Sequence, residues 1–237
     1  MRLCVKWILF QLLIMVLISC TIRDKKPEEQ SHSINAYAPF LEKIKEGNTL
    51  LKDGDLVLRS GEEISSQLIK KINRLDQTWS HSGIVLYENG YPYIYHIVTG
   101  DENPSEKLRR DSLERYSNPR KNSGFAIYRY DMNQEELQSF RNTIMDFYKK
   151  NIQFDSLFNL KTDDKMYCSE MIRKALIIAT NNRIKLETTK PTELEAKFFA
   201  PHLKVDEKYL RSLQIVTIDN LFINPNCRLI RRFDFTQ

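Results

Sequence analysis

The feature that most constrains the fold of this chain is an Asn89-Gly90 pair between two apolar stretches. Residues 82–87 (Ser-Gly-Ile-Val-Leu-Tyr) and 91–98 (Tyr-Pro-Tyr-Ile-Tyr-His-Ile-Val) are rich in β-branched and aromatic side chains. An Asn-Gly pair supports the tight turn with positive φ angles that hairpins require, so we expect the two stretches to pair as antiparallel strands. The fold must therefore contain an antiparallel sheet.

Apolar periodicity predicts further elements around this hairpin. We expect strands at 56–59, 124–130 and near 228–233, helices at 37–51, 64–75, 134–149 and 167–179, short helices around 108–116, 192–199 and 206–213, and a capped turn at 217–221. Within 64–75, five apolar residues share one helical stripe: Ile64, Leu68, Ile69, Ile72 and Leu75. Together these elements predict an α+β fold in which an antiparallel sheet packs against helices.

The N-terminus differs in kind from the rest of the chain. Arg2 and Lys6 precede an apolar run over 7–18 that is too short to cross a bilayer comfortably, and the run ends at Ser19-Cys20. This pattern resembles the lipobox of bacterial lipoproteins, in which the cysteine is diacylated and becomes the new N-terminus. We therefore interpret 1–19 as a lipoprotein signal peptide and Cys20 as the lipid attachment site. The alternatives are a plain signal peptide and an uncleaved anchor helix.

The segment after Cys20 offers almost nothing to bury. Residues 20–36 are polar and mixed in charge, so we expect a flexible tether followed by one domain over 37–237. Two acyl chains would hold the protein stably to a membrane. The lipobox resemblance implies the bacterial cell envelope, and Thr21, in place of Asp, favours the outer membrane, on its periplasmic or surface face.

Charge gives little indication of a partner. The formal net charge is +5, and it falls to +3 when residues 1–19, with Arg2 and Lys6, are removed. No run of Lys and Arg is interleaved with aromatic residues in the manner of a nucleic-acid groove. We therefore expect no nucleic-acid partner, and the sequence carries no signal for an oligomeric state.

Two thiols remain in the mature domain, because Cys4 leaves with the signal peptide and Cys20 is acylated. Cys168 and Cys227 could form a disulfide in an exported protein. However, Cys168 stands at the start of the predicted helix 167–179, where unpaired N–H groups and the positive helix end lower a thiol pKa. We favour two free thiols, with Cys168 as a candidate nucleophile. The alternative is a buried structural cysteine.

Two histidines are placed to assist a thiol. His81 precedes the strand 82–87 between small residues that leave room beside its ring, as a general base requires. His96 lies on the neighbouring strand, where pairing across the turn can bring it near His81 to fix its tautomer. The alternative for His81 is a hydrogen-bonded core histidine, and the alternative for His96 is an inward- or outward-facing sheet histidine with no functional role. No further ligands at suitable spacing accompany them, so we expect neither a metal nor a cofactor.

Four segments carry a family resemblance: 54–57 (Gly-Asp-Leu-Val), 79–85 (Trp-Ser-His-Ser-Gly-Ile-Val), 167–171 (Tyr-Cys-Ser-Glu-Met) and 216–221 (Val-Thr-Ile-Asp-Asn-Leu). In this order they resemble the YiiX-type permuted branch of the NlpC papain-like cysteine hydrolases, over residues 51–233. The resemblance implies a circularly permuted papain-like fold with the nucleophile at a helix N-terminus. It also implies Cys168 as nucleophile, His81 as base and His96 as the third polar residue, although members often carry a carboxylate near that third position. We interpret Asp55, which the family shares, as turn-forming.

These observations lead to three functional hypotheses. The first is a cell-envelope cysteine hydrolase that cleaves a peptidoglycan-peptide or N-acyl amide bond through a thioester on Cys168. The second is a lipid-directed thiol acyl hydrolase or acyltransferase, and the third is a non-catalytic surface-binding lipoprotein. An apolar groove beside Cys168 would favour a lipid substrate, whereas a polar cleft with Arg or Lys would favour a peptide.

Overall fold

The computed structural model describes residues 27–100 and 103–235. The predicted signal peptide, the lipid attachment site at Cys20 and the first part of the predicted tether lie outside the described residues. The chain divides into two compact units, Met1–Pro39 and Phe40–Gln237. The second unit contains the whole sheet and both central helices, and the description below concerns it.

The first helix, α2 (Pro27–Leu50), begins earlier than the sequence predicted. Proline suits the first turn of a helix, because its missing N–H would be unpaired there. Residues 27–36 are helical and lie within the segment 20–36 that the sequence predicts to be a flexible tether. The role of this segment as a membrane tether stays a prediction.

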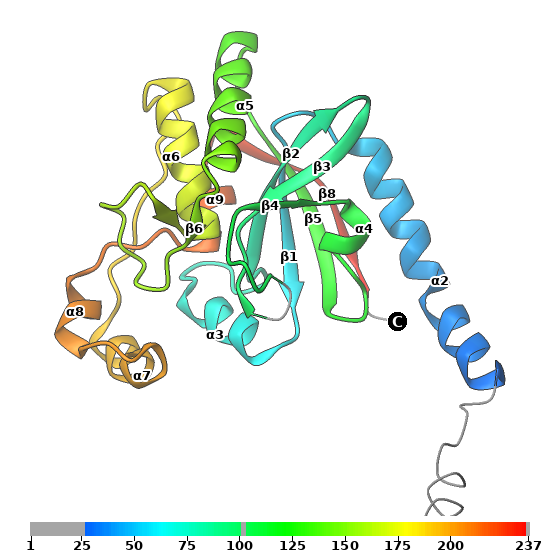
Figure 1. Ribbon diagram of the computed structural model, residues 1–237, viewed down its shortest axis with the longest axis horizontal. Helices are drawn as coiled ribbons and strands as arrows, with labels where there is room; N and C mark the ends of the chain where they lie inside the picture. Colours follow the sequence, from blue (N-terminus) through cyan, green and yellow to red (C-terminus); the bar gives the residue numbers. More distant parts are fainter. Residues whose placement is uncertain (1–26, 101–102, 236–237) are drawn as a thin grey trace, which may run out of the picture. The chain divides into compact units, whose positions relative to one another are not determined.

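One antiparallel sheet forms the centre of the second unit (Figure 1). Its strands follow the order β4-β3-β2-β1-β5-β8. Their bounds are β1 (Leu56–Gly61), β2 (His81–Glu88), β3 (Tyr91–His96), β4 (Arg109–Asp111), β5 (Asn122–Tyr130) and β8 (Cys227–Asp234). Two further short strands, β6 (Gln153–Phe154) and β7 (Lys165–Met166), form a separate parallel pair. The predicted α+β class with an antiparallel sheet is confirmed.

The hairpin that the Asn-Gly pair predicted is present between β2 and β3. Asn89 and Gly90 both have positive φ angles, of 51° and 85°. The turn sets a register in which Ile84 pairs with Tyr95 and Val85 with Ile94. This register places the start of β2 beside the end of β3, where His81 and His96 lie.

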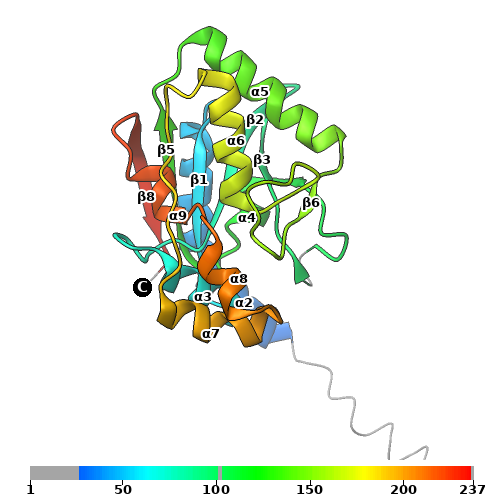
Figure 2. The ribbon, with the colours of Figure 1, turned by 90° about the vertical axis from the view of Figure 1, so that its left-hand side faces the viewer.

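The two central helices cover one face of the sheet. They are α5 (Gln134–Lys149) and α6 (Cys168–Thr180), which pack side by side (Figures 1 and 2). A capping box at Asn133 begins α5, whose bounds match the predicted helix 134–149. Side chains that alternate along β1 and β2 pack against these helices and form the main core, which includes Leu56, Leu58, Ile84, Leu86, Phe140, Ile144, Met171, Ile172 and Leu176.

The predicted helix over 108–116 is wrong in its first half. Residues Arg109–Asp111 instead pair with β3 as the edge strand β4, and only α4 (Leu113–Tyr116) is helical. The Ser112 side chain caps α4 by accepting a hydrogen bond from the Arg115 N–H. Pairing with a neighbouring strand therefore overrides the local helical pattern at this point, and it brings Asp111 to the sheet.

Shorter helices gather at one end of the sheet. These are α3 (Ile64–Ile72), α7 (Glu193–Leu203) and α8 (Glu207–Ser212), which lie near one another in both views (Figures 1 and 2). The helix α3 stops at Ile72, so the predicted stripe is wrong at its ends: Ile64 is 81% exposed and Leu75, beyond the helix, is 77% exposed. A small apolar cluster joins α7 and α8 through Ala196, Ala200, Leu210, Leu213 and Ile215.

A buried ion pair anchors the start of β1. The Asp55 carboxylate is fully buried and accepts hydrogen bonds from Arg129 Nε at 2.6 Å and from the Lys52 N–H at 2.7 Å. A second hydrogen bond from the Arg129 guanidinium, at 2.8 Å, makes the pair bidentate. The predicted turn-forming role of Asp55 is therefore present, together with a salt bridge across β1 and β5.

Removal of one partner should destabilise the fold strongly. In Arg129→Ala the Asp55 carboxylate would be buried without its counter-charge, so we expect the free energy of unfolding to fall by about 3–5 kcal/mol. Urea unfolding followed by circular dichroism measures this loss. Arg228 lies opposite Arg129 on β8 and is exposed, so Arg228→Ala should stay within about 0.5 kcal/mol of the parent protein. Equal losses in both variants would contradict a special role for the buried pair.

Candidate active site

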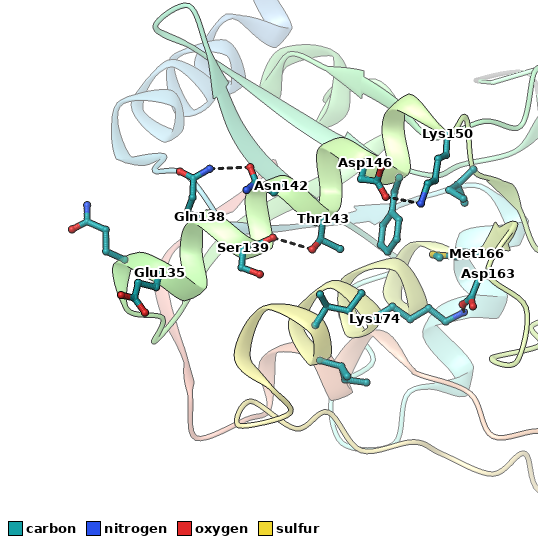
Figure 3. Close-up of a pocket in the computed structure, with 15 residues that line it drawn as sticks. Glu135, Gln138, Ser139, Asn142, Thr143, Asp146, Lys150, Asp163, Met166 and Lys174 are labelled. Carbon is teal, nitrogen blue, oxygen red and sulfur yellow. Dashed lines mark hydrogen bonds and ion pairs between the residues drawn. The ribbon is translucent and has the colours of Figure 1, made fainter.

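The candidate site is a cavity of about 590 Å³ at the end of the sheet where β2 and α6 begin. Its lining includes Cys168, His81 and Arg59. A larger cavity, of about 1050 Å³, is formed mainly by α5 and α6, and its lining contains neither cysteine nor histidine (Figure 3). The smaller cavity is therefore the one in which acyl-transfer chemistry can take place.

The loop before α9 (Ile218–Phe222) fixes the position of Cys168, the first residue of α6. The Val216 N–H donates to the Tyr167 hydroxyl at 2.8 Å, and the Ser169 hydroxyl donates to the Val216 carbonyl at 2.6 Å. The Glu170 carboxylate caps the helix by accepting from the Tyr167 N–H at 3.2 Å. These contacts hold Cys168 at a helix N-terminus, as the sequence predicted.

The chain before β2 is attached to the same loop. The Asp219 carboxylate accepts hydrogen bonds from the N–H groups of Arg74 and Leu75, both at 2.7 Å. The Asn73 amide donates to the Trp79 carbonyl at 2.9 Å and accepts from the Ile218 N–H at 3.0 Å. The segment 216–221, which carries part of the family resemblance and the predicted capped turn, thus holds the helix α6 and the chain before β2 together.

The two histidines meet across the hairpin, as predicted. His81 Nε2 lies 2.9 Å from His96 Nδ1, and both rings are buried. Gly83 permits this close approach, because a Cβ there would lie 2.5 Å from Ile94 Cγ2 and 3.2 Å from His96 Cβ. The Tyr116 ring of α4 packs on both imidazoles, with ring centroids 5.7 Å from His81 and 5.0 Å from His96.

Asp111 extends this pair into a chain of three. His96 Nε2 lies 3.0 Å from the Asp111 carboxylate, which also accepts from Arg109 at 2.6 Å. Burial raises the pKa of Asp111, but the hydrogen bonds from His96 and Arg109 outweigh it and hold that pKa below its ordinary value. Asp111 is therefore an ionised acceptor at neutral pH, and His96 must carry its proton on Nε2 to bond with it.

The protonation of His96 determines that of His81. Because the His96 proton is on Nε2, His96 Nδ1 is an acceptor, and His81 must donate to it from Nε2. Burial lowers the pKa of His81 well below its ordinary value, and the charge of Arg59 lowers it further. His81 is therefore neutral, with an unprotonated Nδ1 that can accept a proton.

The thiol of Cys168 is also neutral at rest. Burial raises its pKa, while the hydroxyl and backbone of Ser82, the backbone of Ser169 and the charge of Arg59 oppose that rise. The Ser82 hydroxyl is fully buried and has no other hydrogen-bond partner among the described residues. Cys168 and Cys227 are both free thiols, as favoured from the sequence, and burial raises the pKa of Cys227 to about 12.

The structure brings Cys168 and His81 to one cavity from different sides of β2. The thiol lies beside Ser82. The residue before Ser82 in the strand, His81, directs its ring toward Tyr116 and His96 instead. Within the described part of the chain no hydrogen bond joins the sulfur to the ring. Bonds between a nucleophile and its base are often long before substrate binds and shorten in the complex.

Three further site residues were not identified from the sequence. Asp111 lies in a segment that the local pattern predicts to be a helix. The one signal for it is the tendency of family members to carry a carboxylate near the third polar residue of the triad. Ser82 on β2 lies within the family-like segment 79–85 but was given no role, and Arg59 on β1 lies outside all four of those segments. Arg59 pairs with His81 in the sheet register, which places its charge beside both histidines.

Most of the cavity wall is apolar. The helix α3 has no buried residue, because its apolar stripe faces the cavity. Aromatic and aliphatic residues from α7, α8 and the loops before α6 and α9 complete the wall. The apolar lining includes Leu68, Ile69, Ile72, Phe158, Phe199, Leu203, Leu213 and Ile215.

The described residues provide no metal site: no group of three or more His, Cys, Asp or Glu side chains within 27–100 and 103–235 could hold an ion. None of the helices in the described ranges is long and apolar enough to cross a membrane.

Comparisons with known proteins identify the fold and the family of this chain. The crystal structure of the metalloprotein YiiX from Escherichia coli O157:H7 superposes with a TM-score of 0.60 at 19% identity, covering 76% of this chain and 97% of that one. This similarity supports the permuted papain-like fold. No curated protein matches the chain. The family model for permuted papain-like amidases, YaeF/YiiX, family C92, matches residues 50–224. The chain therefore belongs to the YaeF/YiiX family of permuted papain-like amidases.

Proposed function

We propose that the protein is a cysteine hydrolase of the bacterial cell envelope that cleaves the amide bond of a substrate carrying an apolar acyl chain. The observation that carries this proposal is the shared cavity, which Cys168 and His81 both line together with a largely apolar wall. A cavity of about 590 Å³ falls in the range of small-molecule sites. The apolar lining favours an acyl chain over a polar peptidoglycan peptide.

The chemistry proceeds through a thioester. His81 Nδ1 takes the proton of the Cys168 thiol as the sulfur attacks the carbonyl carbon, giving a tetrahedral intermediate. The C–N bond then breaks, and the leaving amine takes that proton from His81. Water attacks the thioester, His81 accepts a proton from it and returns it to the sulfur, and the carboxylic acid leaves. With another acceptor in place of water, the same steps would transfer the acyl group.

The developing negative charge on the carbonyl oxygen requires donors. The Cys168 N–H at the first position of α6 is one, because the first N–H groups of a helix lack partners within it. The Arg59 charge lies close enough to affect the pKa of Cys168 and of His81, so it also stabilises an anion at this position. His96 and Asp111 act as positioning residues that fix the His81 tautomer.

The cellular setting rests on the N-terminal sequence. The lipobox-like end of the apolar run at Cys20 supports diacylation and attachment to the cell envelope, with the outer membrane favoured. A lipid anchor would hold the domain close to amphiphilic substrates. Hydrolysis of an acyl anilide, with thiol labelling in the His81→Ala variant, distinguishes this enzyme from a non-catalytic surface-binding lipoprotein with the same fold.

Acyl-chain selectivity tests the proposal directly. Decanoyl p-nitroanilide should be hydrolysed with a kcat/KM at least about 100-fold above that of p-nitroacetanilide, since each buried methylene contributes about 0.8 kcal/mol. Release of p-nitroaniline measures the rate. Cys168→Ala and His81→Ala should abolish turnover, and a decanoyl chloromethyl ketone should label Cys168 in the parent protein but not in Cys168→Ala. Labelling at full rate in His81→Ala, without turnover by the parent protein, would favour the non-catalytic alternative.

The pH dependence of thiol alkylation tests the resting state. Because burial raises the pKa of Cys168, its alkylation by iodoacetamide should keep rising above the ordinary thiol midpoint of about pH 8.5. Ser82→Ala should move the midpoint to higher pH, since Ser82 lowers that pKa. Mass spectrometry of the Cys168 peptide measures the rate, with the Cys227 peptide as an internal control that reacts more slowly. A midpoint in the acidic range would instead indicate a thiolate–imidazolium pair.

Because Asp111 fixes the tautomers of His96 and His81, its substitution should lower the catalytic rate. Asp111→Asn removes the acceptor-only partner of His96, so we expect kcat for decanoyl p-nitroanilide to fall about 100-fold, within the range for general base catalysis. KM and the thermal midpoint should change little. Asp111→Glu, which keeps the charge, should recover part of the rate. A rate loss that Asp111→Glu does not relieve, together with a lower thermal midpoint, would assign Asp111 a structural role only.

A further inference from the structure

Exposed apolar side chains lie next to the residues that line the catalytic cavity. Among the residues that the structure describes, nine large apolar side chains are exposed, and five of them lie within two positions of a lining residue. We call these five the apolar rim: Ile64 of α3, Leu75 after α3, Leu157 in the loop after β6, and Leu194 and Phe198 of α7. An exposed side chain whose chain neighbours line a cavity lies where that cavity meets the surface.

Contacts from the rim to the wall make the apolar surface continuous. The ring centroid of Phe198 lies 5.2 Å from that of Phe199 and 5.1 Å from that of His202, and both of these residues line the cavity. The ion pair between Arg74 and Glu195, with one hydrogen bond of 2.7 Å, joins the chain after α3 to α7. The apolar interior of the cavity therefore extends onto the outer surface of α7.

The charged residues around the rim balance one another. The segments 62–76, 154–158 and 190–204 together contain six Lys or Arg residues and six Asp or Glu residues. A surface with balanced charge has no electrostatic preference for an anionic partner. A partner that binds here must therefore do so through the apolar side chains, and a zwitterionic lipid surface has both the apolar chains and the zero net charge that match the rim.

A lipid bilayer is the occupant that suits both the rim and the cavity. A second copy of the chain, or another folded protein, would close the entrance that substrate must use, whereas a fluid bilayer can cover the rim and supply acyl chains through it. The proposed lipid anchor also keeps a bilayer within reach. Six residues separate Cys20 from Pro27, so that linker extends over about 25 Å at most, and the 24-residue helix α2 is about 36 Å long.

We propose that the apolar rim inserts into the surface of a zwitterionic bilayer, and that the acyl chain of the substrate passes from the bilayer into the catalytic cavity. The substrate class is then an N-acylated amphiphile that resides in a membrane. Each rim side chain that leaves water for lipid favours docking in proportion to its apolar area. Docking itself requires no turnover, whereas the delivery of the acyl chain rests on the proposed function.

Tryptophan fluorescence measures docking without turnover. Phe198→Trp is introduced into the full-length protein, which is reconstituted with vesicles of phosphatidylcholine that carries bromine, a contact quencher, in its acyl chains. Ile178→Trp is the matched control, because Ile178 is 58% exposed, against 50% for Phe198, and lies near the end of α6 that is distant from Cys168. The added emission of Phe198→Trp should be quenched and that of Ile178→Trp should not. Salt should leave the quenching unchanged, because the charges around the rim balance.

The location of the substrate tests delivery. In the double variant Leu194→Ser, Phe198→Ser, hydrolysis of palmitoyl p-nitroanilide held in phosphatidylcholine vesicles should fall at least about tenfold, because two large apolar side chains no longer enter the lipid. Decanoyl p-nitroanilide in solution should be hydrolysed at the parent rate, since neither side chain lines the cavity. Ile178→Ser should leave both rates unchanged.

Three results would overturn the proposal. The first is equal quenching at positions 178 and 198, and the second is an equal effect of the double substitution on both substrates. The third is protection of Phe198→Trp from aqueous acrylamide in lipid-free protein, which would place a second copy on the rim. If the parent protein does not hydrolyse decanoyl p-nitroanilide, the proposed function fails, and the quenching still decides whether the rim docks on lipid.

Discussion

The structure depends on the direction of hydrogen bonding from His81 through His96 to Asp111. These residues lie on the three neighbouring strands β2, β3 and β4, so the antiparallel sheet itself aligns them. A carboxylate can only accept, and this single restriction orders the protons on both imidazoles. The lone pair that results on His81 points away from the carboxylate. The three-residue edge strand β4, which carries Asp111, thereby determines which nitrogen of His81 can accept a proton.

The neutral resting state suits the surroundings of the reacting groups. Burial raises the thiol pKa and lowers both histidine pKa values, so neither group is charged before reaction. A thiolate–imidazolium pair would be costly beside an apolar wall, because little water is present to solvate it. The positive charge of Arg59 instead acts when negative charge develops during attack. An apolar acyl pocket and an acyl-transfer site can therefore share one cavity.

The sequence predicted the fold well where local signals and tertiary packing agree. The Asn-Gly turn defined the hairpin and its register, and the periodicity of α5 and α6 identified the central helices, because each pattern is complete within one element. Prediction failed where contacts between residues far apart in the sequence determine the structure. Arg109–Asp111 became a strand by pairing with β3, and the stripe of α3 faces a cavity rather than the core. His96 was located, but Asp111 and Arg59 depended on strand order, which local pattern does not encode.

The order of the site residues along the chain has a consequence for assembly. The hairpin with both histidines, the edge strand with Asp111 and the partner strand β1 all precede Cys168, and the loop that holds α6 follows it. Because a chain is synthesised from its N-terminus, the residues that form the hydrogen bonds from His81 to Asp111 are all made well before Cys168. The last third of the chain supplies Cys168, the loop that holds it and the helices α7 and α8 of the cavity wall, whereas α3 lies in the first third. The site therefore has no positioned thiol until nearly the entire polypeptide has been synthesised and has folded.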